Sequence, residues 1–206
     1  MNDKLILIGG GGHCKSCIDV IEQKRIHTIT GILDQTASVG GTVLGYNIIG
    51  TDEDIAGLAA GHHFLITVGQ IKSPEIRMTI YRKILEAGGY LASVISPRAY
   101  VSPHALVGPG TIVMHGATIN AGAEVGTNCI INSHALVEHD AVIGDHCHIA
   151  TGAIINGGAV VGRGCFVGSH AMLREYIHVN DNLIIGGGET ILHDRLAPEP
   201  SGRPRK

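Results

Sequence analysis

The chain has 206 residues, enough for one large or two small domains, and its net charge of −3 comes from acidic and basic residues mixed along the sequence. Because no basic stretch forms the footprint of a polyanion, binding to nucleic acid is not expected. No apolar run reaches the roughly 20 residues of a membrane span, and the first residues lack a signal-peptide pattern. We therefore expect a cytoplasmic protein without a membrane partner.

The amino-terminal part has the pattern of a Rossmann-like βαβ unit in an α/β domain with a parallel sheet. The apolar run 4–8 predicts a buried strand, the four glycines 9–12 a tight loop, residues 13–23 a helix and residues 28–33 a second strand. Further strands are expected near 43–49 and over 63–68, with helices over 52–60 and 73–86. We place this domain at residues 1–90.

The glycine loop offers backbone N–H groups and a helix amino terminus to an anion. The dinucleotide fingerprint G-x-G-x-x-G fails, because its last glycine would fall on Cys14 or Lys15, counted from Gly9 or Gly10. A nucleotide diphosphate suits the loop better, and a purely structural turn is the alternative. Asp34 ends the next strand, where it would accept hydrogen bonds from a ribose or uracil or serve as an ordinary strand-end acid.

Every sixth residue from Val101 to Ile191 is Ile, Val or Leu, and the residue two places earlier is Ala, Thr or Cys as far as position 171. This period predicts a parallel β-helix of hexapeptides, with three hexads to a triangular coil and about five coils. Cys129, Cys147 and Cys165 are eighteen residues apart, so we expect one interior column of buried free thiols. The second domain is placed at 91–206, ending in a polar tail that we expect to be flexible.

One histidine of the repeat region stands between two acids, in Glu138-His139-Asp140. It follows the interior position Val137, so its side chain is expected to point outward. A flanking carboxylate holds an imidazole in one tautomer and raises its basicity, as a general base requires. His148 lies half a coil further on, so we expect the two histidines to share a site only across a groove between copies, in a closed oligomer of three subunits.

A metal site is the competing interpretation of these histidines. His134 and His139 have the spacing of two ligands, as in hexapeptide carbonic anhydrases. Such enzymes take a third imidazole about two coils earlier, where this chain has Arg98 and Pro103. We therefore expect no metal, and a metalloenzyme stays an alternative.

Taken together, the chain resembles the sialic-acid O-acetyltransferase family of left-handed β-helix acyltransferases, most of all its bacterial UDP-4-amino-sugar N-acetyltransferases. The resemblance runs from LILIGGGGH through ILD and ITVG to VEHDAVIGDHCHIATGAIINGG and IIGGG. It implies a UDP-sugar-binding α/β domain, then a left-handed parallel β-helix that binds acetyl-CoA as co-substrate. It also implies a homotrimer with active sites between subunits.

The resemblance also implies roles for single residues. His139 would take the proton from the sugar amine, and Asp140 would be its acidic neighbour. His148 would lie by the thioester or the pantetheine arm, while Gly157 and Gly187 would give backbone contacts to coenzyme A. A backbone N–H or His148 would stabilise the oxyanion of the tetrahedral intermediate.

In the amino-terminal domain, the resemblance implies six residues that contact the nucleotide sugar. Gly11, Gly12 and His13 would hold the phosphates and sugar, and Asp34 with Gln35 would contact the uracil and ribose edge. Gly69 would line the same pocket. Two alternatives of other kinds stay open. One is an O-acetyltransferase acting on sialic acid or another sugar hydroxyl with the same base, and the other is a scaffold without catalysis.

Overall fold

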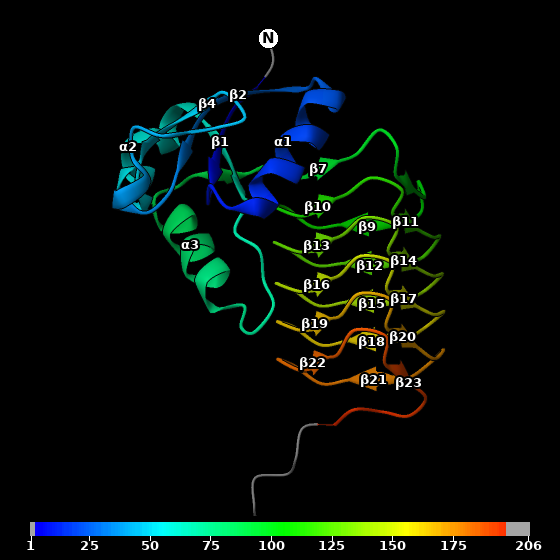
Figure 1. The fold of residues 1–206 in the computed structure, drawn as a ribbon. Coiled ribbons are helices and arrows are strands. Elements are labelled where there is room, and N and C mark those ends of the chain that lie inside the picture. The colour runs from blue at the N-terminus through cyan, green and yellow to red at the C-terminus, as the bar shows by residue number, and fades with distance from the viewer. Residues whose placement is uncertain (1–2, 197–206) are drawn as a thin grey trace, which may run out of the picture.

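The computed structural model describes residues 3–196, which form an α/β domain packed against a parallel β-helix (Figure 1). The fold class predicted from the sequence is confirmed. Most of the tail that was expected to be flexible lies outside the described residues. Within residues 3–196, no helix is long and apolar enough to cross a membrane.

The α/β domain has a six-stranded sheet in the order β3-β4-β2-β1-β5-β6, parallel except for the β3–β4 pair. Its strands are β1 (Asp3–Ile8), β2 (His27–Leu33), β3 (Thr42–Val43), β4 (Tyr46–Gly50), β5 (His63–Ile66) and β6 (Tyr90–Leu91). Its helices are α1 (Gly12–Lys24), α2 (Ile55–Leu58) and α3 (Glu75–Glu86), with short 3-10 turns at Thr36–Ser38, Asp52–Asp54 and Ala59–Gly61.

Two predicted elements of this domain differ from the structure. The strand expected near 43–49 is an antiparallel hairpin whose two turn residues, Leu44 and Gly45, both have positive φ. Such turns usually carry Asn-Gly or Asp-Gly, so a leucine there hid the hairpin. The helix expected over 52–60 is a 3-10 turn, one α-helical turn and a second 3-10 turn. Its predicted start is confirmed, because Thr51 forms a capping box with Asp54.

The β-helix consists of two-residue strands that stack into three parallel sheets, one for each face of the triangular coil. Face 1 has β7 (Val94–Ile95), β10 (Ile112–Val113), β13 (Ile130–Ile131), β16 (His148–Ile149), β19 (Phe166–Val167) and β22 (Ile184–Ile185). Face 2 has β8 (Tyr100–Val101), β11 (Thr118–Ile119), β14 (Leu136–Val137), β17 (Ile154–Ile155), β20 (Met172–Leu173) and β23 (Thr190–Ile191). Face 3 has β9 (Leu106–Val107), β12 (Glu124–Val125), β15 (Val142–Ile143), β18 (Val160–Val161) and β21 (His178–Val179).

The predicted hexad register is confirmed. Each of the sixteen aliphatic residues from Val101 to Ile191 is the second residue of its strand and belongs to, or packs against, the interior core. The cysteine column is also confirmed, and all five cysteines are free and buried. The thiols of Cys129, Cys147 and Cys165 each donate to a carbonyl on the next coil, at 3.2, 3.0 and 3.1 Å.

The α/β domain covers face 1 of the β-helix (Figure 1). Outward side chains of face 1, such as Ile112 and Ile130, share a core with α1. At the vertex between faces 1 and 2, His115 contacts Asp19 of α1 with 2.8 Å between Nε2 and Oδ2. At the vertex between faces 3 and 1, Arg77 of α3 donates to Asn128. The domain therefore leaves the vertex between faces 2 and 3 on the opposite side of the triangle.

Candidate active site

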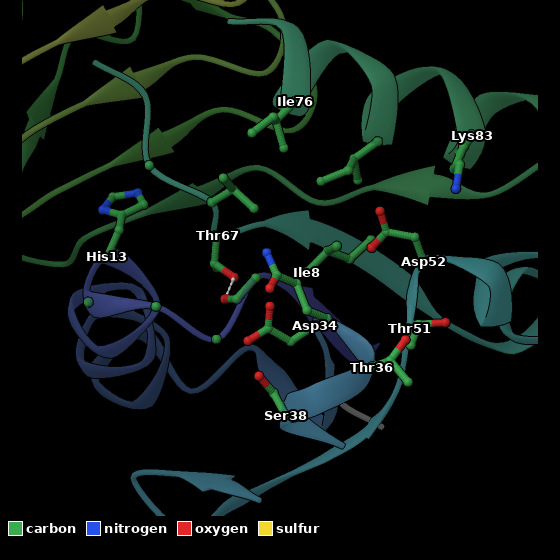
Figure 2. Close-up of a pocket in the computed structure, with 18 of the residues that line it drawn as sticks. Ile8, His13, Asp34, Thr36, Ser38, Thr51, Asp52, Thr67, Ile76 and Lys83 are labelled. Carbon is green, nitrogen blue, oxygen red and sulfur yellow. Dashed lines mark hydrogen bonds between the residues drawn. The ribbon is translucent and has the colours of Figure 1, made fainter. Parts of the chain in front are cut away.

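A cavity of about 860 Å³ opens at the carboxyl ends of β1, β2 and β5 (Figure 2). This is the edge of a parallel sheet at which nucleotides are usually bound. The six residues expected to contact the nucleotide sugar all line it, namely Gly11, Gly12, His13, Asp34, Gln35 and Gly69. The structure therefore brings this predicted group together in one pocket.

The four glycines of the loop divide into two pairs. Gly9 has a φ of +107°, and a Cβ on it would lie 2.5 Å from the Val68 side chain. A Cβ on Gly10 would lie 2.7 Å from a carboxylate oxygen of Asp34. The fold itself thus requires the first pair. Gly11 and Gly12 have nothing within 4 Å of such a Cβ, so no packing within the chain explains them.

The start of α1 leaves backbone donors for a ligand. Gly11 is the N-cap residue, no side chain caps the helix, and its first turn carries no acid. The loop is held in place because the Thr67 hydroxyl donates to the Gly9 carbonyl at 2.7 Å, the dashed line in Figure 2. The uncapped N–H groups and the helix dipole together favour a phosphate at this position.

The far side of the pocket carries residues that the sequence analysis did not assign to a site. They come from the turn after β4 and from α3, and they are Thr51, Asp52, Glu53 and Lys83. The Lys83 ammonium donates to Glu53 at 2.7 Å, and burial raises the pKa of Asp52. The cap at Thr51 could be read from the sequence. The approach of Lys83 could not, because it depends on how α3 packs.

A second cavity, of about 550 Å³, lies between the α/β domain and face 1. It shares His13 and Gly69 with the first pocket and is also lined by His148, Asn132, Gln70, Ile71 and Lys72. His148 projects from β16 and is buried, with its ring 6.4 Å from that of His13. The predicted cofactor residue His148 therefore meets the predicted substrate residue His13 within one chain.

Hydrogen bonds fix the tautomer of His148. Asn132 accepts from the Ser133 N–H through Oδ1, so its Nδ2 is the donor that lies 3.1 Å from His148 Nε2. Nε2 is thus an acceptor, and the ring proton is on Nδ1, which donates to the Gln70 carbonyl at 2.6 Å. As arranged here, neither ring nitrogen of His148 has an N–H left for a ligand.

Burial keeps both cavity histidines neutral. It lowers the pKa of His148 to about 4, with a further lowering by the Arg77 guanidinium. It also lowers the pKa of His13 to about 4, helped by Arg77 and His148. Nε2 of His13 is buried and has no hydrogen-bond partner within residues 3–196, so it is a polar atom available to a ligand.

His139 and Asp140 lie at the vertex between faces 2 and 3, in the turn from β14 to β15. Nδ1 of His139 is 2.9 Å from a carboxylate oxygen of Asp140, and more than half of the imidazole surface is exposed, as predicted for an outward side chain. A carboxylate accepts, so Nδ1 carries the proton, and Nε2 is left as a lone-pair acceptor. A Cβ on Gly157 would lie 2.6 Å from that Nε2, so this glycine makes room for the ring.

The structure therefore divides the predicted residues between two places. One is the α/β domain together with the face 1 that it covers, and it includes both cavities and His148. The other is the opposite vertex, with His139, Asp140 and Gly157. Gly187 belongs to neither, because it is exposed in the last turn between faces 1 and 2. No group of three metal-ligating residues within 3–196 includes His134 or His139.

Two family models match parts of the chain, and solved structures match nearly all of it. Residues 4–84 match the PglD N-terminal domain, and residues 140–175 match the bacterial transferase hexapeptide repeats. A mutant of perosamine N-acetyltransferase from Caulobacter crescentus, in complex with CoA and GDP-perosamine, is 30% identical with a TM-score of 0.87. The alignment covers 93% of this chain and 90% of that one.

A second solved relative is the acetyltransferase domain of PglB from Neisseria gonorrhoeae FA1090 in complex with acetyl coenzyme A. It is 29% identical with a TM-score of 0.86, and the match covers 95% of this chain and 93% of that one. WeeI from Acinetobacter baumannii AYE, at 16% identity and a TM-score of 0.61, shares the fold. Among curated proteins, none matches the chain.

An α/β domain followed by a β-helix, with one cavity in the α/β domain and a second between the two domains, matches an acyltransferase of the hexapeptide-repeat class. The chain belongs to the family of hexapeptide-repeat acetyltransferases that carry a PglD N-terminal domain. It is an acetyltransferase whose acetyl donor is acetyl-CoA.

Proposed function

We propose that the protein acetylates the amine of a nucleotide-linked amino sugar, specifically a UDP-4-amino sugar, with His139 as general base. The observation that carries the proposal is the exposed His139–Asp140 pair, in which the carboxylate holds Nδ1–H and leaves Nε2 as a lone-pair acceptor. The uncapped α1 terminus and Asp34 at the strand edge supply the matching nucleotide pocket. The solved Caulobacter relative carries a GDP-linked sugar, so the identity of the nucleotide base is the finer part of the proposal.

The chemistry is a direct transfer. The neutral amine attacks the thioester carbon, and Nε2 of His139 accepts the proton that the nitrogen loses. The tetrahedral intermediate then expels the coenzyme A thiolate, which takes the proton back from the imidazolium and leaves as a thiol. Asp140 stabilises the transient imidazolium. No enzyme nucleophile is needed, and the buried free cysteines stay out of the reaction.

The oxyanion of that intermediate requires a hydrogen-bond donor. The sequence offered a backbone N–H or His148 for this role. Nδ1–H of His148 already donates to Gln70, and Nε2 already accepts from Asn132. We therefore assign the oxyanion to a backbone N–H, and His148 to shaping the cavity wall where the thioester lies.

The active site is completed by a second copy of the chain. Within one copy the nucleotide pocket opens beside face 1, whereas His139 is on the vertex opposite that face. Faces 2 and 3 carry outward apolar side chains, including Tyr100 and Leu106, which a neighbouring copy would cover. Three copies packed face to face would bring each His139 to a neighbour's pocket, so we propose a homotrimer. We also propose that the enzyme works in the cytoplasm.

The acceptor is tested by thiol release from acetyl-CoA with a panel of UDP-4-amino sugars, GDP-perosamine and free sialic acid. Release with the UDP-linked amines supports the proposal as stated. Release with GDP-perosamine alone would show that the acceptor is a GDP-linked amine. Release with sialic acid would show that the reaction is O-acetylation, not N-acetylation. His139→Ala should remove nearly all turnover, while His104→Ala, an exposed histidine in an earlier turn of the same vertex, should not.

Complementation tests the shared site. Gly12→Leu should block the pocket without disturbing the fold, because a Cβ there meets nothing within 4 Å. Co-expressed Gly12→Leu and His139→Ala chains, each inactive alone, should recover about a quarter of wild-type activity, since random mixing gives one site in four with both halves intact. A site formed within one chain would recover none.

A further inference from the structure

Two histidines and an aspartate meet at the amino-terminal edge of the α/β sheet, at the end opposite the glycine loop. Asp3, His27 and His63 are the first residues of the adjacent strands β1, β2 and β5. Asp3 pairs with His27, and His63 pairs with Leu5, two residues along β1. Since side chains alternate along a strand, this register places all three on one face of the sheet.

The three side chains are close enough to share a ligand. One ligand atom from each lies within 4.8 Å of the other two. Nδ1 of His63 is 3.8 Å from a carboxylate oxygen of Asp3. Nδ1 of His27 is buried and has no hydrogen-bond partner within residues 3–196, which is costly for a polar atom unless something binds it. The ring of Tyr90, next to His63 on β6, packs 5.9 Å away and covers one side.

We propose that Asp3, His27 and His63 bind a divalent transition-metal ion, with Zn²⁺ as the best match. Two imidazoles and one carboxylate suit Zn²⁺ and leave the fourth tetrahedral position to water. Ligand atoms around Zn²⁺ are about 3.4 Å apart, given metal–ligand distances of about 2.1 Å. The carboxylate and the His63 ring are about half exposed, so they can move the remaining ångström.

The local charges permit a cation here. Lys24 at the end of α1 adds positive charge nearby, and the Asp3 carboxylate offsets it. The carboxyl end of α1, also at Lys24, presents the negative end of the helix dipole.

The ion would join the starts of three central strands. Ile8, at the nucleotide pocket, is five positions after Asp3 along β1, which is about 17 Å of strand. The site is therefore too far away to touch the reacting groups. Its effect would be on the stability of the α/β domain, because a ligand that binds only the folded state raises the unfolding temperature.

The test is calorimetric titration of Zn²⁺ into the full chain, free of affinity tag and stripped with a chelator. We expect one saturable site with micromolar affinity and a rise in unfolding temperature. His63→Gln and Asp3→Asn should each weaken binding at least tenfold and abolish the thermal shift. His62→Gln is the matched control, because that neighbouring histidine contacts the Leu58 carbonyl instead.

Substituting Co²⁺ reports the coordination directly, since a tetrahedral site with two imidazoles gives visible absorption that should disappear in His63→Gln. Two results would overturn the proposal. One is the absence of saturable binding in the wild-type chain. The other is an affinity equal in wild type, His63→Gln and Asp3→Asn, which would place the ion elsewhere. Because both readouts are independent of acetyl transfer, they do not depend on the proposed function.

Discussion

Replacing Asn132 by aspartate should raise the pKa of His148 toward neutrality. In the native chain Asn132 donates to Nε2 of His148 and thereby keeps that nitrogen unprotonated. An aspartate has only acceptor oxygens, and one of them would still accept from the Ser133 N–H. The other would face Nε2 and favour its protonation. The ring would then donate from both nitrogens, to the introduced carboxylate and to the Gln70 carbonyl.

The structure sets the size of this effect. Burial is the main cause that lowers the pKa of His148 from 6.5 to about 4, with the Arg77 charge adding to it. That difference favours the neutral ring by about 3 kcal/mol. A carboxylate within hydrogen-bond distance shifts a neighbouring pKa by about 1–3 units. In Asn132→Asp the pKa of His148 should therefore lie between about 5 and 7.

The assay is nitrogen NMR of histidine-labelled protein across the pH range, with His148 assigned by its loss in His148→Gln. In the native chain Nδ1 should carry the proton and Nε2 should not, down to about pH 5. Asn132→Leu is the matched control, because it removes the donor without adding charge and should leave the ring neutral. A proton on Nε2 of the native protein, or an unchanged titration in Asn132→Asp, would refute the hydrogen-bond assignment.

Three further changes test other parts of the structure. Arg77→Met should lower the free energy of unfolding in urea by about 3–5 kcal/mol, because the buried guanidinium donates to three carbonyls and one amide oxygen. A loss below about 1 kcal/mol would contradict this. Gly157→Ala should displace the exposed His139 ring and cut turnover by about a hundredfold, while the free energy of unfolding stays unchanged. Full activity of this variant would show that the position of the ring is unimportant. Since the pKa values of His13 and His148 are lowered to about 4, their contribution to stability is complete above the unfolded value of 6.5. It should be lost as the pH falls toward 4, by up to about 1.4 kcal/mol per pH unit for each, and His148→Gln should reduce the slope.

The sequence predicted those parts of the fold that depend on local rules. The interior of the β-helix is so narrow that one position in six must be aliphatic, and the register could be read from that constraint alone. The meeting of the glycine-loop and strand-end residues at one cavity was predictable because the carboxyl ends of parallel strands share one edge. For the same reason Gly11 and Asp34, far apart in the chain, line one cavity.

The parts that could not be predicted depend on contacts between distant segments. Arg77 lies in an amphipathic helix, where an arginine normally faces water, yet it is buried because the turn at Asn128 supplies acceptors. Asn132 lies in an ordinary turn of the repeat, and only the docking of the α/β domain on face 1 turns it into a cavity residue. Which face of the β-helix the α/β domain covers depends on side-chain packing, and a six-residue period does not encode that packing.

The backbone conformation of the β-helix turns also explains the position of Asp140, the acidic partner of His139. From residue 110 to residue 188 the turns carry a residue in the left-handed region, and at the vertex between faces 2 and 3 the column reads Gly122, Asp140, Gly158, Tyr176, with φ near +60 to +75°. In this column a side chain lies over the residue one coil earlier, and glycine leaves room for it: a Cβ on Gly122 would collide with the Asp140 carboxylate, and one on Gly158 with the Tyr176 ring. Aspartate tolerates this conformation better than most residues, because its short side chain can hydrogen-bond locally. The backbone that turns the corner thus also orients the carboxylate toward Nδ1 of His139. The solenoid therefore holds His139 rigidly at this vertex, and its distance from the chain's own α/β-domain pocket is the reason for proposing that a second copy completes the site.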